Sequence, residues 1–242
     1  MRVVAVIPAR HGSTRFPGKP LANILGKPMI QHVYERAKLA KQIDNVVVAT
    51  DHHEIYDVVE SFGGKAIITR TDHESGSDRI AEVAEKVEGD IYLNIQGDEP
   101  LIRFELINEI VALAKENQDC VITAKTKILD INDVMNPNVV KVVSGRDNNA
   151  LYFSRSSIPY NRSNVNITYY KHLGIYCYPK KILMEYVNLP KSKLEEVEML
   201  EQLRLLENGY SIKVIETSYD ALGVDTPEDI QKVEKILEVQ YA

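Results

Sequence analysis

The sequence predicts an α/β fold with a mostly parallel central sheet and helices on both faces. Two observations support this prediction. Over the first 116 residues, short β-branched runs alternate with helical periods at the spacing of right-handed βαβ units. After about residue 120, closely spaced strand patterns indicate a β-rich lobe inserted around residues 138–178. No linker rich in serine and glycine divides the chain, so we expect residues 1–242 to form a single domain.

The first half of the chain alternates strand and helix patterns. Strands are expected at residues 3–7, 45–50, 65–69 and 90–96, where valine, isoleucine and leucine are frequent. Helices are expected at residues 29–42, 52–64, 77–89 and 103–116. In the third of these helices, Ser77 is the expected N-cap and Gly89 the expected stop.

The second half begins with an antiparallel hairpin, expected over residues 138–154 because two apolar runs flank a polar turn. A strand at 169–178, helices near 180–187 and 193–208, and a strand at 210–216 follow. A final helix is expected from Pro227, because Thr226 suits its N-cap and Asp229 completes a capping box.

Composition excludes several classes of protein. With 29 basic and 35 acidic residues the net charge is −6, which argues against a general nucleic-acid binder. The two cysteines are far apart and in no CxxC pattern, so we expect a reduced, cytoplasmic protein. Pro8 and Arg10 interrupt the short N-terminal apolar stretch, so no signal peptide is expected. No apolar run approaches the ~18–20 residues that a membrane span requires.

The segment at residues 8–21 concentrates positive charge directly after the first strand. It carries Arg10, Arg15 and Lys19 among small residues. The GxGxxG motif is absent, and Pro20 stands where a P-loop needs its magnesium-binding hydroxyl. We therefore predict a different anion-binding loop, able to wrap a triphosphate, although a solvated surface loop is the simpler alternative.

Two aspartates are candidate magnesium ligands. Asp98 directly follows the strand at 90–96, and Asp225 is not needed to cap the final helix. Magnesium prefers one or two carboxylates together with substrate phosphates and water. Ordinary turn chemistry is the alternative for both positions. Since ligands bind outside the carboxyl ends of parallel strands, we expect residues 8–21 and 96–100 to face one crevice.

The second half offers candidate groups for an acidic substrate. Arg155, Lys171 and His172 could bind a carboxylate, and Glu201 and Gln202 could bind sugar hydroxyls. The alternatives are a buried, satisfied histidine and a solvated polar helix face. The histidines show no metal-binding spacing such as HExxH, so no zinc site is expected.

A family resemblance covers nearly the whole chain. The segments "IPARHGSTRFPGKPL", "TRTDHESGSDR", "QGDEP", "ALYFSRSSIPY", "KHLGIYCY", "EMLEQLRLLENG" and "GVDTPEDI" occur in the order found in the 3-deoxy-manno-octulosonate cytidylyltransferases, which the chain closely resembles. The resemblance implies a nucleotide-diphospho-sugar transferase type of fold and a homodimer, with the inserted lobe serving dimerisation and sugar binding. It also implies that CTP and 3-deoxy-manno-octulosonate (Kdo) react, with Mg²⁺, to give CMP-Kdo and pyrophosphate for lipopolysaccharide biosynthesis.

The resemblance also implies roles for individual residues. CTP would be held by Ala9, Arg10, Ser13, Arg15 and Lys19. Its cytosine and ribose would be surrounded by Thr69, Arg70, Asp72, Ser75 and Gly76, with Gln96 near the same nucleotide. Kdo would face Arg155, His172, Tyr176, Glu201 and Gln202. Asp98 and Asp225 would bind magnesium and, with Lys19 and Arg10, carry the chemistry. His11 and Lys171 stand where other residues are frequent in the family.

Other functions stay open at this point. A related cytidylyltransferase could activate another acidic sugar, such as a sialic acid or an amino-substituted Kdo. A catalytically silent module that binds nucleotide sugars is a second alternative, but the intact Asp98, Asp225, Arg10 and Lys19 speak against it. The missing GxGxxG disfavours an NAD-dependent oxidoreductase.

Overall fold

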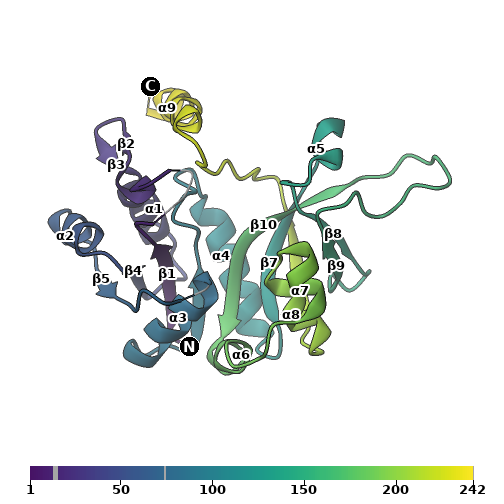
Figure 1. Ribbon diagram of the computed structural model, residues 1–242, viewed down its shortest axis with the longest axis horizontal. Helices are drawn as coiled ribbons and strands as arrows, with labels where there is room; N and C mark the ends of the chain where they lie inside the picture. The colour runs from purple at the N-terminus through teal and green to yellow at the C-terminus, as the bar shows by residue number, and fades with distance from the viewer. Residues whose placement is uncertain (13–15, 74, 242) are drawn as a thin grey trace.

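A central sheet with helices on both faces organises the molecule (Figure 1). The structure is a computed structural model that describes residues 1–12, 16–73 and 75–241. Along its main path, the sheet has the strand order β11-β7-β10-β6-β1-β4-β5. These strands are β1 (Val3–Ala9), β4 (Asn45–Thr50), β5 (Ala66–Ile68), β6 (Ile91–Asn94), β7 (Val121–Lys127), β10 (Tyr170–Pro179) and β11 (Ile212–Thr217).

Along this main path, four of the six neighbouring strand pairs are parallel, in agreement with the predicted mostly parallel sheet. β6, β1, β4 and β5 run in one direction, and β11 is parallel to β7. β10 lies between β6 and β7 and is antiparallel to both. β7 was not predicted, because Thr123 and Lys125 interrupt its apolar residues although both side chains are buried.

Helices cover both faces of the sheet, and others lie beside it. The helices are α1 (Met29–Lys38), α2 (His53–Ser61), α3 (Gly76–Lys86), α4 (Phe104–Glu116), α5 (Ile131–Met135), α6 (Lys180–Tyr186), α7 (Lys193–Glu198), α8 (Gln202–Glu207) and α9 (Pro227–Tyr241). One core lies between the sheet and α1, α2 and α4, and a second lies between the opposite face and α3, α6 and α8. β1 contributes side chains to both cores. Val3, Ala5 and Ile7 belong to the first core, and Val4 and Val6 belong to the second.

Several predicted helix boundaries are wrong, and the helix expected over 29–42 already ends at Lys38. The N-cap of α3 is Ser75 rather than Ser77, because Ser75 and Asp78 form a reciprocal capping box, and the helix ends at Lys86 before Gly89. The helix expected over 193–208 is divided into α7 and α8 at Met199, whose φ of 53° is left-handed. The start of α9 is confirmed, and the Asp229 carboxylate accepts a hydrogen bond from the Thr226 N–H.

The predicted hairpin is also confirmed. It consists of β8 (Lys141–Ser144) and β9 (Ala150–Ser154), and β8 joins the end of β10. Figure 1 shows that the hairpin and the loop after β9 project from the sheet on the side away from α2. A small separate sheet pairs β2 (Asn23–Ile24) with β3 (Lys27–Pro28). Among the described residues, no helix combines the length and the apolar character that crossing a membrane would demand.

Candidate active site

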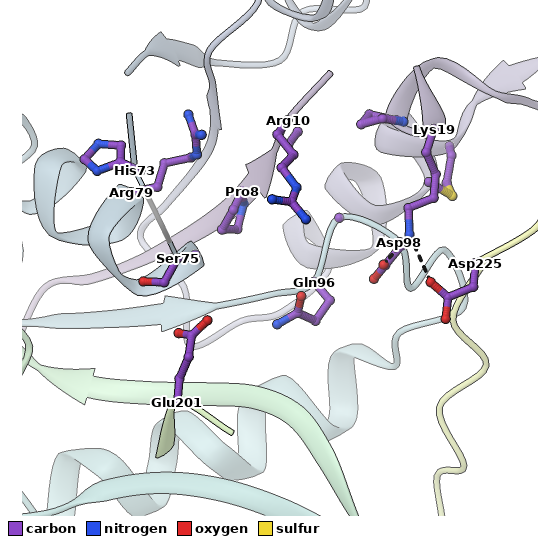
Figure 2. A pocket seen from close by; sticks show the side chains of 15 residues that line it. Pro8, Arg10, Lys19, His73, Ser75, Arg79, Gln96, Asp98, Glu201 and Asp225 are labelled. Atoms are coloured by element: carbon purple, nitrogen blue, oxygen red, sulfur yellow. Dashed lines mark hydrogen bonds and ion pairs between the residues drawn. The ribbon is translucent and has the colours of Figure 1, made fainter. Parts of the chain in front are cut away.

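A cavity of about 320 Å³ opens where β1 and β6 end (Figure 2). Both the segment after β1 and the segment after β6 line it, which confirms the expected shared crevice. Of the residues predicted for the site, the cavity is lined by Ala9, Arg10, Lys19, Ser75, Gly76, Gln96, Asp98, Glu201 and Asp225. The prediction did not include the other lining residues, which are Pro8, Pro20, Met29, His73, Arg79 and Gly97.

The basic wall of the cavity comes from the chain that leaves β1. Arg10 follows the strand directly, and Lys19 begins the 3₁₀ helix η1 (Lys19–Leu21). Gly18 precedes this turn with a φ of 68°, a left-handed conformation that glycine adopts without strain. Figure 2 shows the Arg10 and Lys19 side chains directed toward the cavity. Ser13 and Arg15 lie outside the described residues.

Lys19 joins the two predicted metal ligands. Its Nζ lies 2.6 Å from Asp98 Oδ2 and 3.6 Å from Asp225 Oδ1 (Figure 2). It also donates to the carbonyl oxygen of Val224 at 2.8 Å. The Val224 N–H donates to the Asp98 carbonyl oxygen at 2.9 Å, which fixes the segment before α9 against the end of β6. Two carboxylates that are 127 positions apart thus meet around one cation.

These oxygen atoms fit a magnesium ion chemically. Two carboxylates and a backbone carbonyl are hard oxygen donors, and they already surround a positive charge. The neighbouring Glu99 is not a candidate magnesium ligand. Its side chain is buried, and the pKa of Glu99 is raised to about 8 by burial and by the negative charge of Asp98. Most Glu99 is therefore uncharged at pH 7, which relieves the repulsion expected between adjacent carboxylates.

Close packing of backbone determines where Asp98 lies. A Cβ atom at Gly97 would lie 2.7 Å from the carbonyl oxygen of Pro8, so only glycine lets the two strand ends approach this closely. On the other side, Gln96 Nε2 donates to the Gly174 carbonyl oxygen of β10 at 2.8 Å. The cavity floor is thus held by contacts between β1, β6 and β10.

The start of α3 supplies the wall opposite Lys19. The Ser75 hydroxyl accepts a hydrogen bond from the Asp78 N–H at 3.1 Å, so its orientation is fixed by helix capping. His73 Nε2 lies 2.5 Å from Glu82 Oε2. Arg79 donates to Asp51 Oδ2 at 2.9 Å and to the Thr69 hydroxyl. Arg79 is buried among the apolar residues of α3, and no local pattern in the sequence indicates its place in the cavity wall.

Three residues predicted around the nucleotide do not line the cavity. Thr69 is buried behind Arg79 and donates to the Thr50 carbonyl oxygen at 3.0 Å. Arg70 and Asp72 form an exposed ion pair at 3.3 Å. Thr69 can therefore act on a ligand only through Arg79.

Most of the residues predicted for the sugar also lie away from this cavity. Arg155 donates to the carbonyl oxygens of Glu198, Pro137 and Met199. His172 is buried against Phe153, its Nε2 is 3.0 Å from the Thr123 hydroxyl oxygen, and burial lowers the pKa of His172 to about 3. Such a histidine is uncharged at pH 7 and cannot attract a carboxylate as a cation.

Of the remaining residues predicted for the sugar, three contact other parts of the protein and one lines the cavity. Tyr176 packs with its ring centroid 5.3 Å from that of His172, and Gln202 is buried at the start of α8. Lys171 Nζ lies 2.8 Å from Asp220 Oδ1. Only Glu201 of the predicted sugar residues reaches the cavity, where its carboxylate accepts a hydrogen bond from the Ser77 hydroxyl at 3.4 Å.

Comparison with known proteins identifies the family. The cytidylyltransferase family model matches residues 4–216. The chain is 53% identical to the 3-deoxy-manno-octulosonate cytidylyltransferase of Thermodesulfovibrio yellowstonii, with 98% of each chain covered. It is 51% identical to the protein of the same name from Fusobacterium nucleatum, with 96% of each covered.

Solved structures agree with this assignment. A structure titled CMP:2-keto-3-deoxy-manno-octonic acid synthetase complexed with CTP superposes with a TM-score of 0.95 at 47% identity, covering 99% of this chain and 100% of that one. The 4-diphosphocytidyl-2C-methyl-D-erythritol synthase of Anaerococcus prevotii, at 17% identity and a TM-score of 0.66 over 98% of each chain, shares the fold. The chain therefore belongs to the cytidylyltransferase family, among the 3-deoxy-manno-octulosonate cytidylyltransferases.

Proposed function

We propose that this protein couples CTP to Kdo, giving CMP-Kdo and pyrophosphate for lipopolysaccharide biosynthesis in the cytoplasm. The observation that carries the proposal is the meeting of Lys19, Asp98 and Asp225 at the edge of a cavity beside Arg10. This arrangement combines cations for a triphosphate with carboxylates for a divalent ion. The identity to named Kdo cytidylyltransferases along nearly the whole chain supports the choice of substrates.

The triphosphate is assigned to the basic wall. Arg10 can bind phosphate oxygens through two parallel N–H groups, and Lys19 supplies a point charge. Ser13 and Arg15 belong to the same segment and are assigned to CTP with them, as is the backbone of Ala9. These groups bind the β- and γ-phosphates that leave as pyrophosphate, and they stabilise its negative charge as it departs.

The nucleoside is assigned to the opposite wall. Ser75 and Gly76 at the start of α3, together with Gln96, face the space next to the phosphates. Arg79 holds this wall through Asp51 and Thr69. Arg70 and Asp72 are exposed and could reach the base only by moving toward the cavity.

Asp98 and Asp225 are the residues that would hold Mg²⁺. When bound there, the ion would neutralise phosphate charge and lower the pKa of the sugar hydroxyl. Without a metal ion, the Lys19 ammonium group contacts both carboxylates. Once a metal ion binds these carboxylates, the ammonium group could turn toward a phosphate. The chain's own contribution is to position the reactants and neutralise their charge, since the Kdo hydroxyl attacks the α-phosphate directly.

The sugar is assigned to the side of Glu201. Its carboxylate can accept hydrogen bonds from sugar hydroxyls at the cavity wall. His172 and Tyr176 flank the β10 bulge, whose Gly174 carbonyl oxygen holds Gln96, so we assign them to the outer part of the sugar site together with Arg155 and Gln202. As an uncharged group, His172 would donate or accept a single hydrogen bond.

We also propose a homodimer built on the projecting lobe. Leu129, Ile131, Met135 and Leu151 are large apolar side chains that are each at least 66% exposed near this lobe. Exposed apolar side chains of this size fit a surface that another protein covers. A self-complementary contact through a two-fold axis is the commonest arrangement for a homo-oligomer. Light scattering of the purified protein tests this part of the proposal.

Release of pyrophosphate tests the function. The enzyme is mixed with CTP and Kdo, with and without Mg²⁺, and ATP, GTP and UTP replace CTP as controls. We expect release only with CTP, Kdo and Mg²⁺ together. Parallel reactions with a sialic acid and with amino-substituted Kdo separate the related cytidylyltransferases. Faster turnover of either sugar would reject Kdo as the substrate, and CTP binding without any turnover would indicate a silent binding module.

A further inference from the structure

A cluster of two histidines and a glutamate lies outside the groups assigned to the reaction. His11 follows the end of β1, His52 is the N-cap of α2, and Glu54 is in the first turn of that helix. One ligand atom from each residue lies within 4.8 Å of the other two. Glu54 Oε2 is 3.8 Å from His11 Nε2 and 4.0 Å from His52 Nδ1.

Strand register brings the two histidines together. In the parallel pair of β1 and β4, Ala9 lies opposite Thr50. His11 and His52 are each two residues further on, so their rings leave the sheet edge side by side. The rings stack with centroids 4.0 Å apart and an interplanar angle of 17°. Because 41 positions separate the two histidines, no local spacing in the sequence could indicate this pair.

One nitrogen of the cluster has no partner. His52 Nδ1 is inaccessible to solvent, and no hydrogen-bond partner for it exists among the described residues. A buried polar atom without a partner is rare in folded proteins, and an ion that binds there is one of its ordinary explanations. The atom lies on the side of the ring where Glu54 approaches.

We propose that His11 Nε2, His52 Nδ1 and Glu54 Oε2 bind a first-row transition-metal ion such as Zn²⁺. Imidazole nitrogens with one carboxylate suit Zn²⁺, whereas Mg²⁺ prefers oxygen ligands only. Metal–nitrogen bonds of ~2.0–2.1 Å place tetrahedral ligand atoms about 3.3 Å apart. The glutamate oxygen already lies 3.8 and 4.0 Å from the two nitrogens. Because each nitrogen lone pair lies in the plane of its own ring, one of the two stacked rings must turn out of the stack when both bind the ion.

The ion would tie the start of the basic segment to α2. The His11 carbonyl oxygen accepts from the Gly18 N–H at 3.2 Å, next to Lys19. The His11 N–H donates to Asp51, which also binds Arg79 in the cavity wall. An ion that holds His11 against His52 thus fixes one end of the loop assigned to CTP. We expect it to raise the thermal unfolding temperature.

Apart from the exposed His53, the other cysteine and histidine side chains of the described chain are buried or already have a partner. Cys120 and Cys177 are buried, and burial raises the pKa of each thiol, which disfavours the thiolate that a metal needs. His32 binds the Ile24 carbonyl oxygen, His73 pairs with Glu82, and His172 contacts Thr123. Competition by these side chains is therefore small.

Titration with Co²⁺, a spectroscopic substitute for Zn²⁺, tests the site. Untagged full-length protein without nucleotide is used, and excess Mg²⁺ keeps Asp98 and Asp225 occupied. We expect one Co²⁺ per chain, visible absorption typical of nitrogen ligation, and displacement by Zn²⁺. His11→Asn, His52→Asn and Glu54→Gln should each weaken Zn²⁺ binding about tenfold or more in calorimetry. His53→Asn is the matched control, because His53 is exposed beside the cluster and belongs to no ligand set.

The wild-type titration decides the proposal even if a variant folds poorly. Absence of stoichiometric Co²⁺ binding to the wild type would overturn it. So would folded His11→Asn and His52→Asn proteins, verified by circular dichroism, that bind Zn²⁺ as the wild type does. A loss in His53→Asn equal to that in His52→Asn would also contradict it. Since neither CTP nor Kdo is present, the outcome does not depend on the proposed function.

Discussion

Lys19 Nζ lies 2.6 Å from Asp98 Oδ2 and 3.6 Å from Asp225 Oδ1, so one ammonium group pairs with two carboxylates from opposite halves of the chain. The Asp98 side chain is 32% exposed and that of Asp225 is 56% exposed. Partly exposed pairs of this kind contribute little to stability. Their convergence is therefore best explained by function, and the effects of substitution should appear in turnover.

Asp98→Asn should strongly reduce turnover while leaving the fold intact. The amide keeps the shape of the side chain but removes the charge assigned to magnesium, and we expect turnover to fall by about 10²-fold or more. The free energy of unfolding should change by less than about 1 kcal/mol. Pyrophosphate release and thermal unfolding measure the two effects. Asp119→Asn, at an exposed aspartate, is the control. Near-normal release from Asp98→Asn would reject the metal assignment.

Lys19→Met should weaken CTP far more than Kdo. The substitution keeps an apolar stem and removes the charge assigned to the departing pyrophosphate, so the KM for CTP should rise by about tenfold. The KM for Kdo should change much less. Initial rates with each substrate varied in turn give both constants. Lys181→Met, which removes an 85% exposed lysine from α6, is the matched control. Equal increases in the two KM values would count against the assignment of this loop.

Gly97→Ala should damage both stability and turnover. The added methyl group would lie 2.7 Å from the Pro8 carbonyl oxygen, so backbone must shift at the position that precedes Asp98. Overpacking of this kind costs about 1–3 kcal/mol of unfolding free energy. Gly76→Ala is the stability control, because its methyl group meets no atom closer than 3.8 Å. Urea unfolding compares the two variants, and equal stabilities would show that β1 and β6 can separate without cost.

Glu82→Gln should change how stability depends on pH. Burial opposes ionisation of Glu82, but hydrogen bonds from Lys86, the Arg70 N–H and His73 outweigh it and lower the pKa of Glu82 from 4.5 to about 2. Between these values the unfolded chain binds more protons than the folded one. The stability that Glu82 contributes is thus complete above pH 4.5 and is lost as the pH falls toward 2.

Urea unfolding of wild type and Glu82→Gln at several pH values measures this effect. The wild type should be the more stable protein near neutral pH, and the difference should shrink as the pH falls through about 3. Glu85→Gln changes an exposed glutamate of the same helix and should give no such trend. If the difference in unfolding free energy between wild type and Glu82→Gln stays constant with pH, Glu82 has the same pKa in the folded and unfolded states, which would contradict the prediction.

Local sequence determined much of the fold. Alternation of apolar strands and amphipathic helices predicted β1, β4, β5 and β6 with their intervening helices, because burial on one or two faces leaves a periodic pattern. The capping residues Thr226 and Asp229 fixed the start of α9, since a helix start is satisfied by neighbours in the chain. The carboxyl ends of parallel strands share one edge of a sheet, so the crevice between residues 8–21 and 96–100 also followed from sequence.

Tertiary structure alone decided which distant residues meet. No local pattern shows that β10 inserts antiparallel between β6 and β7, or that this placement buries His172 as an uncharged group. The same holds for Arg79 in the cavity wall and for the stacking of His11 on His52. Strand order and register set these contacts, and both depend on the packing of the whole chain. The sequence could thus name Lys19, Asp98 and Asp225 separately, but only the folded sheet places their charges around one point.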